Sequence, residues 1–497
     1  MSAVSGSSPG GALRTHGPDL AAFAAGAGLF EYVFLRALKM PITIDEALTF
    51  LAHLRASWPA MLSPAHMRVG MPANHLLNSV LARVSASLFG PPELALRLPN
   101  VLAFALYLVF GWRTLRRLAS PALALAAFPL LFANPYVLDF FSLCRGYGLS
   151  LAFLALGVWL GLEALEDRPG GAAKSAGALG ALALASLASF PLVAPLAVAA
   201  AGIIAIRGRR AARRREPLVS IAMREVLPGA LIGAATAAIV LAHLRRMANL
   251  DLLYFGGTRG FVADTVGTLV RKSFYGSARE GALAPWAIGA VVALFWMVNG
   301  LAVWRRRSAS LAFLACLLLL DGSVVESIAA HAFLGSRFVV SRVAIFFVPL
   351  FVFAVVGAAG VLDKEELPAV RRTPTVLAIL VAAAAGWHFA RGANLRWPLD
   401  WRADATTPAM LADLARERAG PAPFLLAAAP QRGAAIEFYR VIEGARWFRG
   451  AERLKGEWTT PADFVYLSPV LLARAEALGF RIVRVYPATG NVLAARR

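Results

Sequence analysis

Charge is scarce in this chain of 497 residues. Asp, Glu, Lys and Arg together make up 16% of the sequence, whereas hydrophobic residues make up 59%. Apolar stretches repeatedly reach the roughly 20 residues that a helix needs to cross about 30 Å of hydrocarbon. This composition excludes an ordinary soluble domain and indicates an integral membrane protein surrounded by membrane lipids.

Cysteine is nearly absent too. The chain has two, Cys144 and Cys316, which lie far apart in the sequence and lack the spacing of metal ligands. They imply no disulfide framework and leave the redox compartment open. The chain also lacks internal repeats, and its low-complexity sequence is confined to the Ser/Gly-rich N-terminus.

A cleavable signal is missing as well. The N-terminal segment has one basic residue, Arg14, and no small-residue cleavage site follows the first apolar run. We therefore expect residues 1–19 to form a disordered cytoplasmic tail and the apolar run to be a retained helix.

Acidic residues are fewer than basic ones, at 29 against 50, which gives a formal net charge of +21. A charge of this sign suits nucleic-acid binding, but the arginines fall in short blocks between apolar segments. Such blocks are typical of cytoplasmic loops between membrane helices. The pattern therefore predicts no nucleic-acid partner.

The apolar segments predict an all-α polytopic membrane protein with about eleven transmembrane helices. We place them at 20–39, 94–112, 121–137, 148–165, 176–190, 191–206, 226–244, 284–304, 309–328, 343–361 and 374–391. The alternative at the Phe190-Pro191 break is one long, kinked helix over 176–206. That alternative would move every later loop to the other side of the membrane, and the charge pattern opposes it.

Basic residues cluster after every second predicted helix. The clusters are Arg113, Arg116 and Arg117; Arg168 and Lys174; Arg207, Arg209, Arg210, Arg213, Arg214 and Arg215; Arg305, Arg306 and Arg307; and Lys364, Arg371 and Arg372. Because Lys and Arg mark cytoplasmic loops, these clusters place the N-terminus in the cytoplasm and the C-terminal tail outside.

Three outer segments are large. The first, 41–93, ends in a run over 74–89 whose polar and apolar spacing suits a helix in the membrane interface, and the second, 245–283, is expected to cap the outer face. The third alternates short apolar runs with helical patterns and predicts a small extracytoplasmic α/β domain over 393–497. The transmembrane domain then covers 20–392.

Acids and arginines gather on the outer side of this predicted bundle. Asp45 and Glu46 follow the first helix, and tracing the chain back and forth brings Asp139 and Arg145 to the same side. Arg337 and Arg342 also fall there. Carboxylates and arginines on one rim predict a membrane enzyme.

Several motifs in the first 165 residues resemble those of the GT-C membrane glycosyltransferases. They are Thr43-Ile44-Asp45-Glu46-Ala47, Asn74-His75, Ala95-Leu96-Arg97-Leu98-Pro99-Asn100, and Asp139 followed by Cys144-Arg145-Gly146-Tyr147-Gly148-Leu149. The acidic pair in the first outer loop is the family's hallmark. Within these enzymes the chain looks most like the glycosyltransferase family 39-like bacterial relatives of protein O-mannosyltransferases and of the aminoarabinose transferase that modifies lipid A. The C-terminal domain matches no module of the family.

The resemblance implies an inverting transferase in a bacterial inner membrane. It would take a sugar from a polyprenyl-phosphate donor and pass it to an extracytoplasmic glycan, lipid or protein acceptor. A carboxylate takes the acceptor's proton while cationic groups stabilise the leaving phosphate. The implied catalytic residues are Asp45, Glu46 and Asp139, with Asp45 as the base, and the implied substrate-binding residues are His75, Arg145, Tyr147, Arg337 and Arg342. No cofactor is predicted, although paired carboxylates are able to hold Mg²⁺ or Mn²⁺.

Each of these residues also has a structural explanation. Asp45 and Glu46 are good first-turn residues for a helix, because acids favour its N-terminal dipole. Arg145 would serve equally as the salt-bridge partner of Asp139, and Arg337 and Arg342 as anchors at the membrane interface. His75 would be a polar residue of the interfacial helix.

Two other classes of protein share this composition. A flippase of lipid-linked saccharides is also basic and multi-pass, but transporters place ionisable groups at the membrane midplane, whereas the charges here lie mainly at helix ends, with Asp321 and Glu326 inside the predicted helix 309–328. A non-catalytic assembly subunit is the other alternative, and the pairing of Asp45 with Asp139 argues against it.

Overall fold

The computed structural model describes residues 9–69, 71, 73–166, 169–253, 255–305, 309–365, 367–417, 424–429, 432–445, 448–453 and 462–496. Arg168, Arg306 and Arg307 of the predicted basic clusters lie outside these residues. The chain divides into two compact units. The helical unit comprises Met1–Val33, Val101–Phe141 and Gly146–Ala393, and the loop–sheet unit comprises Phe34–Asn100, Ser142–Arg145 and Asn394–Arg497.

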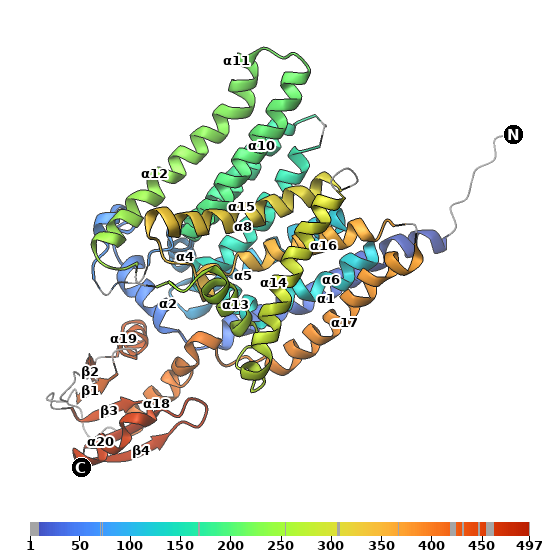
Figure 1. Cartoon of the computed structure of the whole chain (residues 1–497). Helices are drawn as coiled ribbons and strands as arrows, with labels where there is room; N and C mark the ends of the chain where they lie inside the picture. Colours follow the sequence, from blue (N-terminus) through green and yellow to red (C-terminus); the bar gives the residue numbers. More distant parts are fainter. Residues whose placement is uncertain are drawn as a thin grey trace. The chain divides into compact units, whose positions relative to one another are not determined.

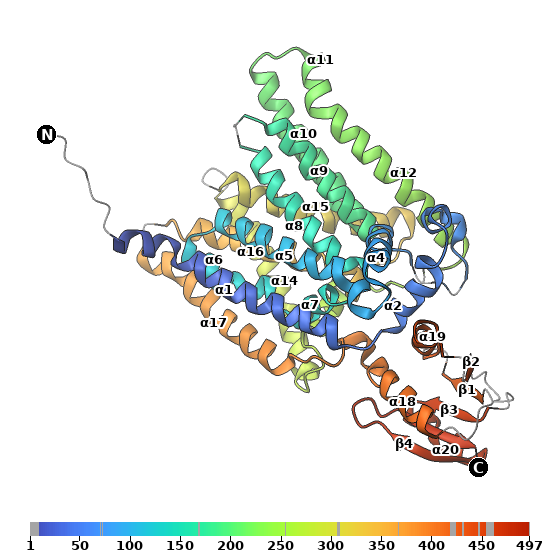
Figure 2. The same ribbon diagram turned by 180° about the vertical axis from the view of Figure 1, so that it is seen from behind.

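Long apolar helices make up most of the chain (Figures 1 and 2). Among the described residues, nine are long and apolar enough to cross a membrane, or ten if the bent pair α6 and α7 is one broken span. The nine are α1 (Pro9–Lys39), α5 (Glu93–Leu118), α8 (Gly146–Ala164), α9 (Gly171–Ala188), α10 (Val193–Arg213), the run from α11 (Leu218–Ile221) through η4 (Ala222–Val226) to α12 (Leu227–Asn249), α14 (Glu280–Trp304), α15 (Leu311–Leu334) and α17 (Pro368–Gly392). The predicted fold class, a polytopic helical membrane protein with a small C-terminal sheet, is confirmed.

Two predicted spans differ from simple transmembrane helices. The segment 121–137 is the bent pair α6 (Pro121–Phe132) and α7 (Pro135–Phe141), whose axes meet at 68°. The bend falls at Asn134-Pro135, where Asn134 Oδ1 accepts from the N–H of Tyr136 at 3.0 Å and starts the second helix. The segment 343–361 is the shorter helix α16 (Phe347–Leu362) of 16 residues.

The break at Phe190-Pro191 separates two helices, as predicted. A 3₁₀ turn, η3 (Phe190–Leu192), lies between α9 and α10, and the two helices pack against each other within the helical unit. Proline has no N–H to continue the helical ladder, which explains why α9 ends before it.

The outer segment 245–283 forms short elements of its own, η5 (Val262–Val266) and α13 (Gly267–Ser273). It is tied to the loop after α15 by an antiparallel bridge between Gly257 and Phe338. Thr268 Oγ1 also accepts from the N–H of Ser341 at 2.8 Å, at the start of η6 (Ser341–Ala344). The segment 245–283 and the loop after α15 therefore contact each other within the helical unit.

The loop–sheet unit begins with short helices between α1 and α5. They are α2 (Ile44–Thr49), η1 (Phe50–Leu54), α3 (Trp58–Leu62), η2 (Pro64–His66) and α4 (Leu76–Phe89). The helix predicted over 74–89 is present as α4, but Asn78 and Ser79 are buried in it and Leu88 and Phe89 are exposed. Asn78 and Ser79 are hydrogen-bonded inside the unit, and the location of this helix in the membrane interface stays a prediction.

The C-terminal part of this unit is a five-stranded sheet with helices. Its strands are β1 (Phe424–Ala428), β2 (Phe448–Arg453), β3 (Phe464–Leu467), β4 (Phe480–Val485) and β5 (Val492–Arg496), in the order β2-β1-β3-β5-β4. The accompanying helices are η7 (Leu399–Asp404), α18 (Thr407–Glu417), α19 (Gly433–Ile442), η8 (Pro469–Leu471) and α20 (Leu472–Ala477). β1 runs parallel to both β2 and β3, and β5 runs antiparallel to β3 and β4. β4 and β5 form a hairpin, whose turn includes Gly490 with φ of 73°.

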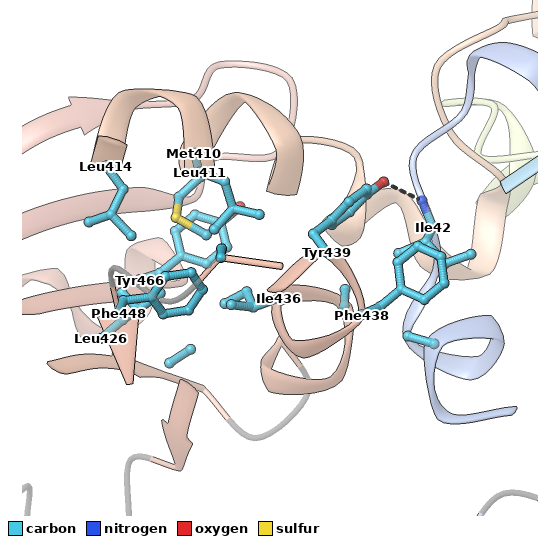
Figure 3. Packing of buried hydrophobic residues seen from close by; sticks show 14 of the residues in the cluster. Ile42, Met410, Leu411, Leu414, Leu426, Ile436, Phe438, Tyr439, Phe448 and Tyr466 are labelled. Atoms are coloured by element: carbon cyan, nitrogen blue, oxygen red, sulfur yellow. Dashed lines mark hydrogen bonds between the residues drawn. The ribbon is translucent and has the colours of Figure 1, made fainter. Parts of the chain in front are cut away.

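One apolar core joins the sheet to the segment after α1 (Figure 3). Ile42, Ala47 and Phe50 are buried in the same cluster as Ile436 and Phe438 of α19. The rings of Phe50 and Phe438 meet edge to face with centroids 5.2 Å apart, a geometry that stabilises aromatic pairs. The C-terminal α/β part therefore shares its core with residues 42–54.

Candidate active site

The acidic pair lies in the first turn of α2, and the local sequence explains why the helix begins there. The side chain of Thr43 accepts from the N–H of Glu46 at 3.4 Å, and Glu46 Oε2 accepts from the N–H of Thr43 at 3.0 Å. This reciprocal arrangement is a capping box, which satisfies two backbone donors that the first turn leaves unpaired.

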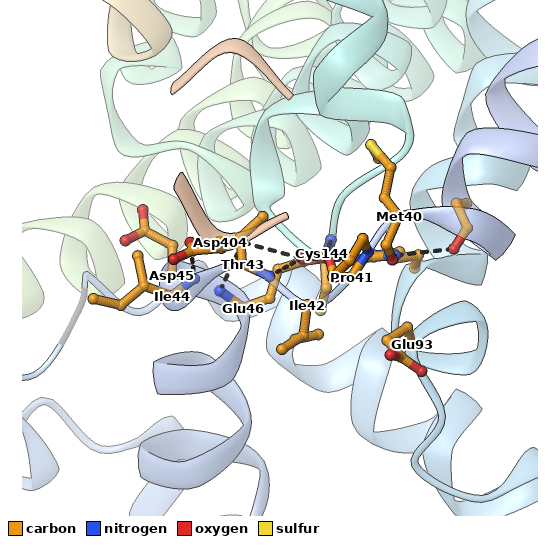
Figure 4. Close-up of polar contacts among 12 residues, drawn as sticks. Met40, Pro41, Ile42, Thr43, Ile44, Asp45, Glu46, Glu93, Cys144 and Asp404 are labelled. Carbon is orange, nitrogen blue, oxygen red and sulfur yellow. Dashed lines mark hydrogen bonds and ion pairs between the residues drawn. The ribbon is translucent and has the colours of Figure 1, made fainter. Parts of the chain in front are cut away.

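Glu46 is closed off from solvent by Arg97 of α5. Arg97 Nε donates to Oε1 and Nη2 donates to Oε2, both at 2.8 Å, and both side chains are fully buried. The N–H of Cys144 donates to Oε1 at 2.7 Å (Figure 4). Burial opposes ionisation, but the charge and hydrogen bonds of Arg97 and the backbone donors hold the pKa of Glu46 below its usual value.

Asp45 is the accessible member of the pair. Its side chain is 18% exposed, and its Oδ2 lies 3.6 Å from Arg145 Nη2, whose own side chain is 4% exposed. Arg145 Nη1 donates to Thr49 Oγ1 at 3.1 Å, and Thr49 Oγ1 donates to the carbonyl of Asp45 at 2.7 Å. Adjacent helical residues point about 100° apart, which is why Asp45 is accessible while Glu46 is enclosed.

Residues of the C-terminal α/β part bond the backbone just before Asp45. Asp404 Oδ2 accepts from the N–H of Ile44 at 2.8 Å, and the hydroxyl of Tyr439 accepts from the N–H of Ile42 at 2.9 Å. Burial raises the pKa of Asp404 to about 6; the Ile44 N–H and Arg432 oppose this shift, and the negative charge of Asp45 adds to it.

The Asn-containing motifs also converge on this part of the loop–sheet unit. Asn78 of α4 donates to the carbonyl of Cys144 at 3.3 Å, and Asn100 donates to Asn78 Oδ1 at 2.7 Å. His75 is the N-cap residue of α4 and is half-buried. Residues 142–145 are thereby attached to α2 through Glu46 and to α4 through Asn78.

Asp139 and Tyr147 belong to the helical unit. Asp139 is buried in α7, and its Oδ1 accepts from the hydroxyl of Tyr275 at 2.7 Å. Tyr275 has φ of 53°, a left-handed conformation that is uncommon outside glycine. Tyr147 is buried at the start of α8, with its ring edge to face against Phe140 at 5.1 Å.

Arg337 and Arg342 flank the bridge between the segment 245–283 and the loop after α15 in the helical unit. Arg337 is exposed. A Cβ added at Gly256 would lie 2.5 Å from the Cβ of Arg337, so there is no room for a side chain at position 256. The guanidinium of Arg342 lies over the ring of Phe255 at 4.8 Å from the centroid. Both arginines therefore line the same loop pair.

The structure thus brings together Asp45, Glu46 and Arg145 in one unit, and Arg337 with Arg342 in the other. Sequence reasoning missed Arg97 as the partner of Glu46, although the Ala-Leu-Arg-Leu-Pro-Asn run drew attention to it. Asp404 and Tyr275 had no local signal. In the part of the chain that the structure describes, no group of three or more His, Cys, Asp or Glu side chains is placed to hold a metal ion.

Comparisons with known proteins agree with the resemblance read from the sequence. Residues 76–232 match the family model described as dolichyl-phosphate-mannose-protein mannosyltransferase. The crystal structure of ArnT from Cupriavidus metallidurans bound to undecaprenyl phosphate superposes with a TM-score of 0.53 at 13% identity, covering 97% of this chain and 98% of that one. Its apo structure gives 0.52 at 13% identity, covering 95% and 97%. The search of curated protein sequences found no match. The chain is thus a multi-span membrane protein with the fold of these ArnT structures, and its residues 76–232 are similar to the mannosyltransferase family model.

Proposed function

We propose that this glycosyltransferase moves a sugar from a polyprenyl-phosphate donor to an extracytoplasmic acceptor with inversion at the anomeric carbon. The observation that carries the proposal is the geometry of the acidic pair. Asp45 is partly exposed beside Arg145, whereas Glu46 is enclosed by Arg97. The matching family is named for a dolichyl-phosphate sugar donor, and the ArnT structure of the same fold binds undecaprenyl phosphate.

Asp45 is the base in this proposal. Its carboxylate takes the proton of the acceptor hydroxyl as that oxygen attacks the anomeric carbon. The bond from that carbon to the donor's phosphate oxygen breaks, and the electron pair leaves with the polyprenyl phosphate. Arg145 lies beside Asp45, and its planar guanidinium is suited to bind a phosphate or to hold the carboxylate in place.

The other predicted residues have different roles. Glu46 has no exposed oxygen, so we assign it to positioning the first turn of α2 and not to contact with substrate. Asp139 stays a candidate catalytic residue, oriented by Tyr275. His75, Tyr147, Arg337 and Arg342 stay candidate substrate-binding residues, and the cationic pair lies on loops able to reach a phosphate.

The proposed placement follows from the charge pattern. The protein would lie in a bacterial inner membrane, with its N-terminus in the cytoplasm and residues 41–93, 245–283 and 393–497 outside. Nucleotide sugars are absent outside the cytoplasm, so a lipid-linked donor is required there. Asp45 and Glu46 lie outside the candidate spans, which favours an enzyme over a transporter with ionisable groups at the midplane.

The test is sugar transfer by the purified protein in detergent or nanodiscs. Parental protein and Asp45→Asn would be incubated with undecaprenyl-phosphate sugars and a panel of envelope glycans, glycolipids and Ser/Thr peptides, and products identified by mass spectrometry. Asn keeps the shape but cannot accept the proton, so we expect transfer to fall by a factor on the order of 10² to 10⁴. Asp400→Asn is the matched control. Transfer by Asp45→Asn at the parental rate would remove the proposed base, and parallel reactions with EDTA, Mg²⁺ or Mn²⁺ test for a metal.

A further inference from the structure

The C-terminal α/β part makes direct contacts with the backbone that carries the proposed base. Ile42 and Ile44 each direct their N–H to a side chain from this part of the chain, Tyr439 of α19 and Asp404 of η7 respectively (Figures 3 and 4). The second bond joins residues 360 positions apart in the sequence. These contacts lie one and three residues before Asp45.

Both side chains are themselves fixed. The hydroxyl of Tyr439 donates to Glu93 Oε1 at 2.7 Å at the start of α5, and α19 is packed in the core shared with Phe50. Asp404 is 3% exposed and has Arg432 Nη1 at 3.5 Å from its Oδ1. Arg432 in turn donates to Asn491 Oδ1 at 3.1 Å. The side chains that accept from Ile42 and Ile44 are therefore each held by further contacts within the loop–sheet unit.

A third contact fixes the end of α1. The buried guanidinium of Arg36 donates from Nη2 to the carbonyl of Trp397 at 3.1 Å, just before η7. The segment 36–46 is thus bonded by Trp397, Tyr439 and Asp404 of the C-terminal part and by Arg97 of α5.

We infer that Asp404 and Tyr439 are positioning residues that make the C-terminal α/β part a required component of the catalytic site. They hold the peptide groups of Ile42 and Ile44 so that the first turn of α2 presents Asp45 to the acceptor. This inference rests on the proposed role of Asp45. A displacement of about 1 Å at a reacting group is enough to reduce turnover about 10²-fold, so small changes in this backbone have large effects.

A positioning role for Asp404 and Tyr439 predicts a change in kcat, whereas a purely structural role predicts a change in protein stability. Loss of the acceptor for the Ile44 N–H alters the geometry of the base, which lowers kcat and leaves the KM values for donor and acceptor near parental. Asp404→Asn keeps an oxygen that accepts from Ile44 and should recover most of the turnover that Asp404→Ala loses. Tyr439→Phe removes the hydroxyl alone and tests the hydrogen bond from the N–H of Ile42.

The experiment compares full-length parental protein with Asp404→Ala, Asp404→Asn and Tyr439→Phe in nanodiscs. Hydrogen–deuterium exchange over residues 40–47 reports the hold on the backbone, and steady-state transfer from undecaprenyl-phosphate sugar reports kcat and KM. Asp413→Ala is the matched control, because Asp413 is a buried carboxylate that bonds Tyr486 at 2.8 Å and Arg484 at 3.1 Å within the same α/β part.

We expect faster exchange over 40–47 and a kcat reduced about 10- to 100-fold in Asp404→Ala and Tyr439→Phe, with neither change in Asp413→Ala. Unchanged exchange, or faster exchange with parental kcat, would overturn the positioning role, as would an equal loss in Asp413→Ala. If the parental protein transferred no sugar while Asp404→Ala still exchanged faster, the proposed function would fail. The conclusion that Asp404 restrains the backbone of residues 40–47 would remain.

Discussion

Glu46 and Arg97 form a two-point ion pair in which neither side chain is exposed. Arg97 also donates from Nη1 to the carbonyls of Ala37 at 3.0 Å and Met40 at 2.6 Å. One guanidinium therefore joins the end of α1, the start of α2 and the first turns of α5. The acid beside the proposed base is part of the framework that holds it.

Glu46→Gln should destabilise the protein strongly. The substitution leaves the guanidinium of Arg97 buried without its counter-charge, and breaking such a pair costs about 3–5 kcal/mol of unfolding free energy. Chemical denaturation of the purified protein followed by tryptophan fluorescence measures this cost.

Glu437→Gln is the control for this measurement. It breaks a solvent-exposed pair with Arg440, which stabilises by no more than about 1 kcal/mol. Replacing both members of the buried pair, as Glu46→Gln with Arg97→Met, should restore part of the lost stability because no buried charge is left. Equal stability of the Glu46→Gln and Glu437→Gln proteins would contradict the framework role.

Asp404 should make stability depend on pH between about 4 and 7. Its pKa is about 6 in the folded protein, against 3.8 for an unperturbed Asp. The folded state therefore binds the proton more tightly, and this group contributes stability that is fully present below pH 3.8 and is lost as pH rises through 6. A shift of this size corresponds to roughly 3 kcal/mol. The charged groups facing Asp404 are Arg432 and Asp45, and Tyr466 is a further titratable neighbour.

The measurement is the thermal midpoint of parental protein and Asp404→Asn from pH 4.5 to 7.5. Asn does not titrate, so the midpoint of Asp404→Asn relative to the parent should rise as pH increases. Asp413→Asn is the control, because the pKa of Asp413 is lowered despite its burial, by Tyr486, Arg416 and Arg484, and its contribution has the opposite sign. A constant difference between Asp404→Asn and the parent across this range would rule out the titration.

The helical layout was predictable because hydropathy is local. Each predicted apolar segment is helical, although 121–137 is the bent pair α6 and α7, and the Phe190-Pro191 break was placed correctly because proline acts on its own neighbours. The strand β2 (Phe448–Arg453) was missed because its sequence, with Arg449, Glu452 and Arg453, lacks the apolar alternation of a strand. Its pairing with β1 supplies the strand geometry instead.

The site was predictable only in part. Asp45 and Arg145 were selected because they stand in motifs, and the structure places their side chains 3.6 Å apart, while their roles in a site stay predictions. The hydrogen bonds from Asp404 to Ile44 and from Tyr275 to Asp139 join distant segments, and no spacing in a single sequence encodes such contacts. The burial of Asn78 in α4 was not predictable either, because its partners, Cys144 and Asn100, belong to other segments of the chain.

Cysteine labelling should establish which side of the membrane faces out. Ala212 and Ala278 are exposed and lie on either side of the span Leu218–Asn249, so they should face opposite compartments. With Cys144 and Cys316 replaced by serine, an impermeant maleimide added to intact cells should label Ala278→Cys, and should label Ala212→Cys only after lysis.

The reverse labelling pattern would place Asp45 on the cytoplasmic side, where nucleotide sugars are present and a lipid-linked donor is not required. Labelling of both positions in intact cells would contradict the span between them. Prior blocking with a permeant maleimide is the control, since it should abolish both signals.

Arg337 and Arg342 offer a direct test of phosphate recognition. They lie on the loop bridged to Gly257, where Arg337 is exposed and the half-buried Arg342 lies over the ring of Phe255. If one of them binds the donor's phosphate, its replacement by Gln should weaken donor affinity by about 1.5–3 kcal/mol, the scale of a hydrogen bond to a charged group. That is roughly a 10- to 150-fold rise in Kd for undecaprenyl phosphate, measurable by thermophoresis.

Arg259→Gln removes the same charge from the neighbouring loop, where Arg259 pairs with Asp264, and should leave Kd near parental. Parental Kd in both Arg337→Gln and Arg342→Gln would remove these arginines from the donor site, and the phosphate would then have to be bound by Arg145, beside Asp45.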